Sequence, residues 1–415
     1  MKIIVLGGGV IGVTTAWFLS RDGHDVTVID REEAVADGTS FANAGLLSPG
    51  HAFAWARPGV PATLLRSFWR DDTGLRLRPR LDPDMWSWGL KFLAQCTHGR
   101  ARVNSLRKLR ISAYSQDVLH DLIADTGIAF DPDRGGILYL HRDAAALDRG
   151  IAEMRLLVDE GVRMEVLDAQ GCARVEPALA HLGASIAGAV YCPDDEHGDC
   201  NKFTRALGDL AAGAGVTFQF NTTIQEIEAD GASVARVRTD KGNFTADAYV
   251  MALGPQSPLV ARGLGVKLPI YPVKGYSMTF PVTSSHQGPI GSGVDEGLLM
   301  AWSRLGDRLR LTSTAEIAGY DLSRPPAQYA AMRRAAEALF PGGADFDHGE
   351  VWCGLRPLTP EGTPIFGRGR HENLWFNTGH GSMGWTMACG SARVTADLIA
   401  GRDAGIDLTG MVLTE

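Results

Sequence analysis

Residues 1–30 are MKIIVLGGGVIGVTTAWFLSRDGHDVTVID, and their pattern is the clearest indication of the fold class in the chain. Its apolar run at 3–6 has the composition of a strand that is buried on both faces. Apolar residues then recur at helical spacing as far as Gly23, where a glycine favours the end of a helix. A second apolar run at 26–29 finishes on Asp30. Strand, helix and strand in this order predict a βαβ unit with parallel strands.

Three glycines, Gly7, Gly9 and Gly12, separate the first strand from the helix at G-x-G-x-x-G spacing. In a dinucleotide-binding unit the first makes a tight turn, the second lets backbone N–H groups approach a pyrophosphate, and the third lets the helix pack against the strand. Asp30 stands where a carboxylate would bond a ribose hydroxyl. A purely structural βαβ unit is the alternative, but strand, helix and acid all occupy the places that a dinucleotide requires. The pattern by itself fits NAD and FAD equally well.

The composition is that of a globular protein with two lobes. The chain has 415 residues, of which 45% are hydrophobic, and its net charge of −8 argues against general binding to nucleic acids. It contains no apolar run of eighteen residues, and we expect no secretory leader because the first predicted strand begins at residue 3. Its six cysteines are scattered without a C-x-x-C pair. We therefore expect a cytoplasmic protein with reduced thiols.

Two further stretches are typical of ligand contact. TSFANAGLLSPG (39–50) is rich in small and hydroxyl residues, which let a backbone wrap around a bulky ligand and offer short hydrogen-bond donors. A plain surface loop is the alternative, but the stretch closely follows the acid expected to bond the ribose. The apolar strand AYVMALG (248–254) ends in glycine, as strands of a doubly wound sheet do at the ligand crevice.

Residues 51–110 differ in charge from the rest of the chain. They hold twelve basic residues, Arg57, Arg66, Arg70, Arg76, Arg78, Arg80, Lys91, Arg100, Arg102, Arg107, Lys108 and Arg110, against four acids, Asp71, Asp72, Asp82 and Asp84. Four tryptophans are interleaved with them: Trp55, Trp69, Trp86 and Trp88. A basic, tryptophan-rich stretch suggests a surface that docks on anionic lipid or on a partner. The alternative is a solvated helix face whose aromatic rings belong to the core.

The middle of the chain combines helices and strands. The residue spacing predicts helices at about 104–126, 144–160 and 327–340, and strands at 136–140, 271–282, 297–304 and 308–313. The last three strands would form an antiparallel floor for a substrate lobe.

The segment DDEHGDC (194–200) contains residue types that ligate metals. Its spacing fits no usual metal site, and Asp199 or Asn201 is suited to cap a helix that starts near Phe203. We therefore predict no metal site.

The last quarter of the chain carries two motifs rich in glycine or proline. WCGLRPLTPEG (352–362) places Arg356 in what the prolines predict to be a rigid turn. NTGHGSMGWT (377–386) leads into a final helix that ends near Gly401. Glycine-rich turns before a helix present N–H groups to an anion or to the electron-rich edge of a flavin.

With these motifs in place, the whole chain resembles the bacterial D-amino acid dehydrogenases of the glycine oxidase and D-amino acid oxidase superfamily. The resemblance rests on the glycine fingerprint with Asp30 and on TSFANAGLLSPG (39–50), YPVKGYSMT (271–279), GLRPLTPEGTPIFG (354–367) and NTGHGSMGWTMACGSARVTADLIAG (377–401). It implies non-covalent FAD and the oxidation of a D-amino acid, or of a cyclic D-imino acid of the D-proline type, to its imino product. Water would then give the 2-oxo acid and ammonia, and the electrons would pass to a quinone-type acceptor.

The resemblance also implies roles for particular residues at the cofactor. We expect FAD to be held by Gly7, Gly9, Val10, Ile11, Gly12, Asp30, Arg31, Ser40, Asn43, Ala44, Gly45, Leu46, Ala252, Gly254, Gly379, Gly381, Ser382, Met383, Gly384, Trp385 and Thr386. The sarcosine oxidase branch attaches FAD through a cysteine near the arginine motif. Here Cys353 falls one residue away from that position, which favours non-covalent FAD.

At the substrate, Arg356 matches the arginine that pairs with the substrate carboxylate in related oxidases. Those oxidases often add a tyrosine where this chain has Met300, so the second carboxylate contact would fall to Tyr276 or Tyr320. His380 is expected to belong to the flavin loop, and no side-chain base is assigned because hydride transfer from a neutral amine needs none.

The implied fold is α/β, with a Rossmann-like FAD-binding domain of the D-amino acid oxidase type and an antiparallel-sheet α+β substrate domain. We expect the first at 1–85, 190–268 and 345–415, and the second at 86–189 and 269–344. The partners would be a small D-amino acid, a quinone or other electron acceptor, and a membrane touched peripherally at its inner face through residues 55–110, with no nucleic acid. An oxygen-using amino acid oxidase and a non-catalytic FAD- or NAD-binding module are the alternatives, and the side chain of the substrate stays open.

Overall fold

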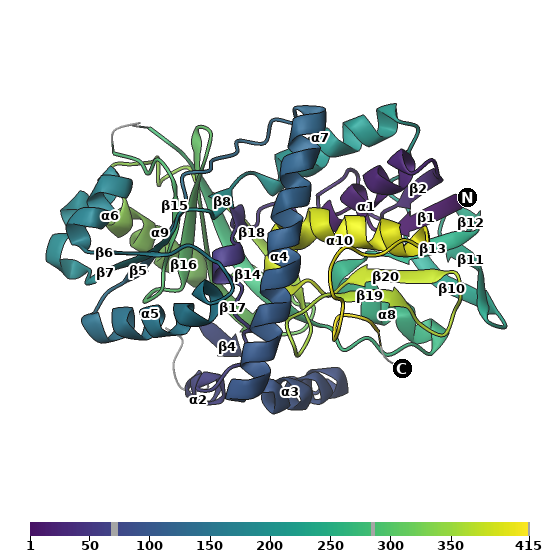
Figure 1. The fold of residues 1–415 in the computed structure, drawn as a ribbon, viewed down its shortest axis with the longest axis horizontal. Coiled ribbons are helices and arrows are strands. Elements are labelled where there is room, and N and C mark those ends of the chain that lie inside the picture. The colour runs from purple at the N-terminus through teal and green to yellow at the C-terminus, as the bar shows by residue number, and fades with distance from the viewer. Residues whose placement is uncertain (68–73, 284–286, 414–415) are drawn as a thin grey trace.

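The computed structural model describes residues 1–67, 74–283 and 287–413, and its described strands form two large sheets (Figure 1). The first has six strands in the order β19 (Ile365–Arg368), β20 (Leu374–Thr378), β13 (Ala248–Met251), β1 (Lys2–Leu6), β2 (Asp25–Ile29) and β9 (Thr217–Gln219). All neighbours are parallel except β19 and β20. The order places β1 between β13 and β2, which is the arrangement of a Rossmann-like sheet.

Both faces of the six-stranded sheet are covered, which explains why β1 is apolar throughout its inner length. On one face Ile3 and Val5 pack with residues of α1 (Val10–Arg21), α7 (Cys200–Gly213) and α10 (Gly384–Ile399). On the other face Ile4 and Leu6 pack against a small antiparallel sheet of β10 (Ile224–Asp230), β11 (Ser233–Thr239) and β12 (Gly242–Phe244). Burial on both faces requires a continuous apolar run in place of an alternating one.

The second sheet has nine strands and is mainly antiparallel. Its order is β18 (Glu350–Leu358), β14 (Tyr271–Pro281), β17 (Arg308–Ile317), β16 (Met300–Leu305), β15 (Ser292–Asp295), β5 (Ile137–His141), β7 (Gly188–Cys192) and β6 (Glu165–Leu167), with β4 (Leu75–Leu77) paired to β17. The pairs β15–β5 and β17–β4 are parallel. Helix α9 (Pro326–Leu339) and the short α6 (Ala169–Val175) contribute to the core cluster on one face of this sheet.

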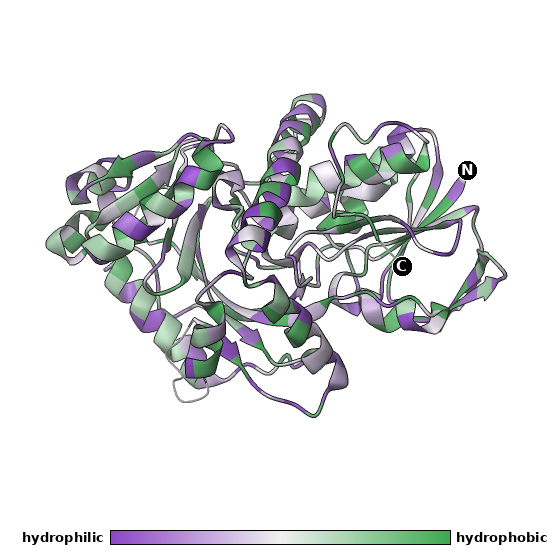
Figure 2. Ribbon diagram, turned by 60° about the horizontal axis from the view of Figure 1, so that its bottom comes forward, coloured by the Kyte–Doolittle hydropathy of each residue, from purple (hydrophilic) through white to green (hydrophobic). Residues whose placement is uncertain are grey.

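Helix α4 (His98–Thr126) runs between the two sheets in Figure 1. It packs tightly on α10, since a Cβ added to Gly390 would lie 2.8 Å from the Cα of Ser115. Helices α2 (Val60–Arg66) and α3 (Pro83–Gln95) lie at one end of α4, and α5 (Ala144–Val158) lies beside β5 and β7. Figure 2 shows hydrophobic and hydrophilic residues alternating along these helices, as expected for helices with one buried face. In the described part of the chain, no helix combines the length and the apolar character needed to cross a membrane.

Most predicted elements are confirmed, including β1, α1 and β2, and Asp199 caps α7 by accepting hydrogen bonds from the N–H groups of Asn201 and Lys202. One prediction is wrong: Arg356 lies in strand β18 and not in a turn, because Pro357 sits near the strand end at the edge of the sheet. Strand β15 was not predicted. Helix α4 begins at His98, earlier than predicted, because Thr97 caps it.

Three strands belong to a different sheet from the one that the predicted domain division implies. The expected FAD-binding segments 1–85, 190–268 and 345–415 include β4, the end of β7 and β18. Their hydrogen bonds join all three to the nine-stranded sheet. A strand joins one sheet or the other through pairing with strands far apart in the sequence, and residue spacing does not reveal this pairing.

Candidate active site

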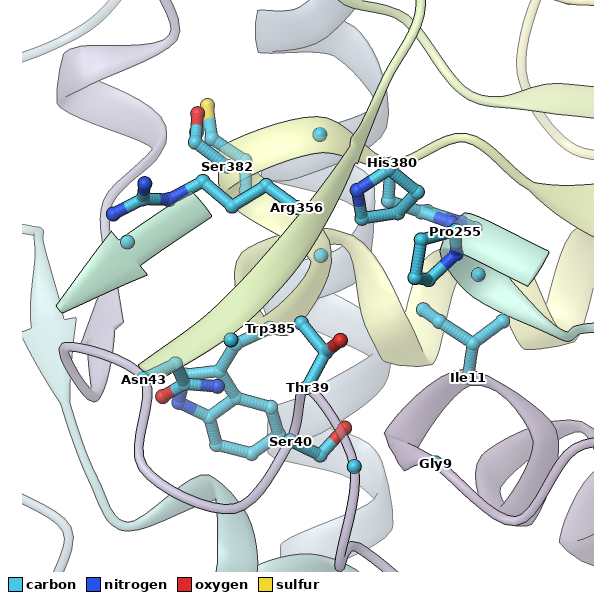
Figure 3. Close-up of a pocket in the computed structure, with 18 of the residues that line it drawn as sticks. Gly9, Ile11, Thr39, Ser40, Asn43, Pro255, Arg356, His380, Ser382 and Trp385 are labelled. Carbon is cyan, nitrogen blue, oxygen red and sulfur yellow. The ribbon is translucent and has the colours of Figure 1, made fainter. Parts of the chain in front are cut away.

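A cavity of about 1040 Å³ extends from the glycine fingerprint to the face of the nine-stranded sheet. Ligand pockets usually measure roughly 300–1,000 Å³, so this one can hold a large molecule. In Figure 3, Gly9 and Ile11 lie at one side of the cavity, and Arg356 and Ser382 lie at the other. The cavity therefore has a nucleotide end, at Gly9, and a substrate end, at Arg356.

The structure brings most of the predicted site residues to this cavity. Its lining includes Gly7, Gly9, Val10, Ile11, Asp30, Arg31, Ser40, Asn43, Ala44, Gly45, Leu46, Ala252, Gly254, Tyr276, Arg356, His380, Gly381, Ser382, Met383, Gly384, Trp385 and Thr386. Three predicted residues, Gly12, Gly379 and Tyr320, are absent from the lining.

The nucleotide end is made mainly of backbone. Gly7 has a φ of +112°, and a Cβ there would lie 2.6 Å from the carbonyl oxygen of Ala252. A Cβ on Gly12 would lie 1.8 Å from the carbonyl oxygen of Gly7, so this glycine permits the close approach of α1 to the turn. Helix α1 has Gly9 as its N-cap, with no side-chain cap and no acid in its first turn. Its unpaired N–H groups suit an anion such as a pyrophosphate.

Asp30 follows β2 and faces the same end of the cavity. Its carboxylate accepts hydrogen bonds from the backbone N–H of Gly8 and, at 2.9 Å, of Glu32. Burial raises the pKa of Asp30, and the two backbone donors act in the opposite direction. The carboxylate oxygens keep further lone pairs, which can accept a ligand hydroxyl.

The loop over residues 39–50 is tied to both ends of the cavity. Ser40 Oγ accepts a hydrogen bond from the N–H of Val10 at 3.0 Å, and this contact joins the loop to α1. Thr386 Oγ1 donates to the carbonyl of Leu46 and accepts from the N–H of Ser48, both at 3.2 Å. These bonds hold the loop against the N-terminus of α10. The loop and the glycine-rich segment before α10 are therefore in direct contact.

The segment before α10 contributes two buried polar atoms. His380 Nε2 and Trp385 Nε1 have no hydrogen-bond partner among the described residues, and both side chains line the cavity. Unsatisfied buried polar atoms are rare and call for a ligand or water. Burial lowers the pKa of His380 to about 3, so its imidazole is neutral near pH 7. Gly379 lies behind this segment, where a Cβ would press on Thr359 Cγ2 at 2.9 Å.

Arg356 is the cation at the substrate end. Its guanidinium donates to the carbonyl oxygens of Lys274 (3.4 Å) and Thr314 (3.3 Å) and lies 5.8 Å from the ring centroid of Trp55. No carboxylate within the described residues forms an ion pair with it. Burial lowers the pKa of Arg356 to about 10, so the group stays charged at neutral pH. A charge without a counter-ion in such a site favours an anionic ligand.

Gly275 makes room for this guanidinium, a role that the sequence did not reveal. A Cβ at Gly275 would lie 2.5 Å from Cζ and from both terminal nitrogens of Arg356. Register in the sheet pairs Gly275 with Gly354 and Val273 with Arg356. The guanidinium therefore lies flat over a strand that must have no side chain at this point.

The two tyrosines expected to assist Arg356 have other partners. Tyr320 lies outside the cavity lining, and its hydroxyl donates to the carbonyl of Pro255 at 2.7 Å. Tyr276 lines the cavity, but its hydroxyl donates to Glu316 at 3.1 Å. Met300 is buried and is absent from the lining. Neither hydroxyl is free to bind a carboxylate in this arrangement.

Residues that the sequence analysis did not assign to the ligand site complete the substrate end. His51 Nε2 lies 3.1 Å from Glu296 Oε1, and the His51 ring stacks on Tyr139 at 4.6 Å between centroids. Lys108 lines the cavity from α4, and Trp55 lines it from the segment after His51. Trp55 and Lys108 were counted in the basic, tryptophan-rich stretch, and their place in the cavity depends on long-range packing.

No group of three or more His, Cys, Asp or Glu side chains in the described ranges is arranged to hold a metal ion. Cys353, the residue considered for covalent FAD, donates its thiol to the carbonyl of Leu322 and does not line the cavity.

A family profile described as FAD dependent oxidoreductase (DAO) matches residues 2–398. The chain belongs to this family. FAD is accordingly the cofactor of the protein. The fingerprint alone did not distinguish FAD from NAD. The residues present fit FAD, because the cavity joins an anion-binding helix terminus at one end to unpaired polar atoms, His380 Nε2 and Trp385 Nε1, beside the substrate end.

Two relatives are similar along their whole length. The D-amino acid dehydrogenase of Paramagnetospirillum magneticum is 46% identical over 412 residues, covering 99% of this chain and 98% of that protein. D-amino acid dehydrogenase 2 of Mesorhizobium japonicum is 46% identical over 413 residues, covering 99% of each.

Solved structures share the fold at low sequence identity. Glycine oxidase from Geobacillus kaustophilus superposes with a TM-score of 0.78 at 22% identity, covering 100% of this chain and 99% of that one. L-proline dehydrogenase from P. horikoshii gives 0.72 at 18% identity, covering 97% and 94%. The predicted fold class, an FAD-binding domain of the D-amino acid oxidase type with a sheet-rich second domain, is confirmed.

Proposed function

We propose that this FAD-dependent oxidoreductase is a D-amino acid dehydrogenase. It oxidises the Cα–N bond of a D-amino acid to an imine, and water then releases the 2-oxo acid and ammonia. The observation that carries the proposal is Arg356, a cation without a counter-ion at the substrate end of the FAD cavity. The two relatives at 46% identity, both named for D-amino acids, support the choice of substrate class.

Arg356 positions the substrate by its carboxylate. A guanidinium can pair with a carboxylate through two parallel hydrogen bonds, which set orientation as well as affinity. Gly275 and the ring of Trp55 restrict the guanidinium, so that the bound carboxylate adopts one direction. Fixing Cα in this way lowers the entropic cost of reaching the reactive geometry.

The cofactor is held without a covalent bond by backbone groups and short side chains. Gly7, Gly9 and the N-terminus of α1 would hold the pyrophosphate, and Asp30 would accept a hydrogen bond from the ribose. The loop at 39–50 and the segment 380–386 would hold the flavin ring. When bound, FAD supplies the acceptor for the hydride that leaves Cα.

The substrate must present a neutral amine, because its lone pair assists loss of the hydride. His380 does not exchange the amine proton near neutral pH, since its pKa lies at about 3. Its neutral imidazole instead offers a hydrogen-bonding atom, Nε2, to the ligand in the cavity.

Anaerobic bleaching of the bound flavin tests this function. D-amino acids should reduce the yellow holoenzyme, and the corresponding L-amino acids should leave it oxidised. In air, a dehydrogenase should form little peroxide, whereas an oxygen-using oxidase forms peroxide with each turnover. Absence of bleaching by every amino acid of either configuration would contradict the proposal.

The electron acceptor is proposed to be a quinone, reached at a membrane surface by α3 and its neighbours. Helix α3 exposes Trp86 (47%), Leu90 (70%) and Leu93 (44%), spaced so that they share one helical face. Leu81 before α3 and Leu65 of α2 are also exposed, and Leu64 of α2 packs in one cluster with the buried face of α3. An amphipathic helix of this kind can lie in a lipid interface.

Several residues of the basic stretch 55–110 are not available to such a surface. Trp88 is buried and donates to the carbonyl of Leu358, while Trp55 and Lys108 line the cavity. Arg57 and Arg110 pair with Glu153 and Asp407 respectively. Trp69, Arg70, Asp71 and Asp72 lie outside the described residues. Exposed cations of this stretch, such as Arg66 of α2, Lys91 of α3 and Arg102 of α4, can attract anionic lipid.

Vesicle co-sedimentation with the full chain tests this contact. Recovery with anionic vesicles should exceed recovery with neutral ones and should fall at high salt, because screening shortens the Debye length from about 10 Å at 0.1 M to about 3 Å at 1 M. Leu90→Glu should abolish binding, and Leu210→Glu, on exposed α7, should not. Equal recovery in the supernatant for both lipids would favour a soluble acceptor.

A further inference from the structure

Lys108 is a buried cation for which the proposed function has no use. It projects from α4, is 2% exposed and lines the cavity. Its ammonium donates one hydrogen bond, to the carbonyl oxygen of Phe53. An ammonium has three donors, so two have no acceptor among the described residues. No carboxylate there lies within ion-pairing distance of it.

A second cation, Arg57, adds to the charge at this place. It lines the same cavity, and its positive charge acts on Lys108. Burial, and to a lesser extent this repulsion, lowers the pKa of Lys108 to about 7. Arg57 also pairs with Glu153, at 2.6 Å. The carboxylate of Glu296, which also lines the substrate end, is bonded to His51 and not to Lys108. A cation in this setting is costly unless a ligand supplies the opposite charge.

The two cations share one wall of the cavity with Arg356. The segment 53–57 supplies the carbonyl that holds Lys108, the Trp55 ring that contacts Arg356, and Arg57 itself. Two residues of backbone span at most about 7 Å, so Phe53 and Trp55 are close. A small molecule bound to Arg356 can therefore extend along this wall toward Lys108.

We propose that Lys108 and Arg57 form a second anion subsite, and that the substrates are D-amino acids with an acidic side chain. This rests on the proposed function and names the substrate class within it. The α-carboxylate binds Arg356, and the side-chain carboxylate binds Lys108 and Arg57. The amine and Cα lie between the two anchored ends.

Steady-state kinetics of the holoenzyme with matched substrates tests the subsite. D-glutamine is the neutral counterpart of D-glutamate, with nearly the same size. The wild-type enzyme should show kcat/KM at least about 10-fold higher for D-glutamate. Lys108→Met should lower kcat/KM for D-glutamate by at least about 30-fold and change that for D-glutamine by less than about 3-fold. Lys108→Arg should restore much of the loss, and Lys267→Met, at an exposed lysine outside the cavity lining, should have no effect.

Binding of glutarate gives a readout that needs no turnover. Glutarate should perturb the flavin spectrum at lower concentration than butyrate does, and Lys108→Met should remove this advantage. The same variant should have a raised Tm without ligand, because it replaces an unpaired buried cation with an apolar side chain. A residue needed only for structure would lower the Tm when replaced.

The outcomes separate this inference from the function on which it rests. If neutral D-amino acids reduce the flavin and D-glutamate has no advantage, the acidic subsite is wrong and the dehydrogenase stands. If glutarate binds through Lys108 and no D-amino acid reduces the flavin, the dehydrogenase is wrong and the anion subsite stands. An equal loss of activity on D-glutamate and D-glutamine in Lys108→Met would also overturn the subsite.

Discussion

The two ends of the cavity are built in different ways. The nucleotide end consists of turns and a helix terminus from one short segment, and glycines such as Gly7 and Gly12 are required there by backbone contacts. The substrate end consists of side chains that converge from distant segments: Arg356 from β18, Tyr276 from β14, Lys108 from α4 and Glu296 from the residue after β15. The nucleotide end depends on backbone conformation, and the substrate end depends on side chains brought together from distant segments.

This difference explains how substitutions should act. At the nucleotide end an added methyl group collides with backbone, which cannot move aside, so the effect is on folding and cofactor retention. At the substrate end a replacement changes charge or direction in a cavity that remains formed, so the effect is on kcat/KM.

Gly12→Ala should give the largest effect. Its Cβ would lie 1.8 Å from the carbonyl oxygen of Gly7, and overpacking costs about 1–3 kcal/mol or more when the neighbour is rigid. We expect the protein to purify without flavin. The flavin content is measured as the visible absorbance of the flavin relative to the absorbance of the protein. Gly89→Ala, in α3 with no atom near the added Cβ, should retain FAD. A Gly12→Ala protein that retained its yellow flavin would contradict the proposed difference between the two ends of the cavity.

Arg356→Ala should leave FAD bound and lower kcat/KM for D-amino acids. Loss of one partner of a buried charge pair costs roughly 2–5 kcal/mol, which is about 30-fold to several-thousand-fold. Steady-state kinetics and flavin content measure the two effects separately. Arg334→Ala, which changes an exposed arginine of α9, is the control. Near-full activity of Arg356→Ala on every D-amino acid would show that the carboxylate binds elsewhere.

Gly275→Ala should have a smaller effect of the same kind. The added Cβ would lie 2.5 Å from the guanidinium of Arg356, which would have to move. A displacement of about 1 Å can cost on the order of 100-fold, so we expect a loss of about 10- to 100-fold in kcat/KM with FAD retained. The double variant with Arg356→Ala should be no worse than Arg356→Ala alone. Additive losses would mean that Gly275 acts independently of Arg356.

His380→Gln should change the pH dependence of stability. The pKa of His380 is about 3 in the folded protein and ordinarily 6.5, so between these values the unfolded chain binds more protons. Stability therefore falls as pH drops through this window, by about 2 kcal/mol from pH 7 to pH 5 for this residue. The fall in apparent Tm between pH 7 and pH 5 should be smaller in His380→Gln than in the wild type. An identical fall in both proteins would contradict a neutral buried His380.

Much of the nucleotide end could be predicted because each requirement is local. Three glycines at fixed spacing, an apolar strand before them and Asp30 after the next strand set both the chain path and the ligand class. The place of Arg356 was predicted only through the resemblance to a family. The prolines around it suggested a turn, and the structure shows strand β18, because pairing with β14 outweighed the local preference.

The βαβ unit, the glycine fingerprint and the apolar strands follow from the sequence, because short-range sterics and burial on two faces restrict which residues can occupy them. The surroundings of the substrate depend on tertiary packing. Tyr320 bonds to Pro255 and leaves the cavity, Gly275 makes room for a guanidinium from the next strand, and Lys108 enters the cavity from α4. These contacts join residues far apart in the chain, and the packing of two sheets around one helix fixes them where no residue spacing can.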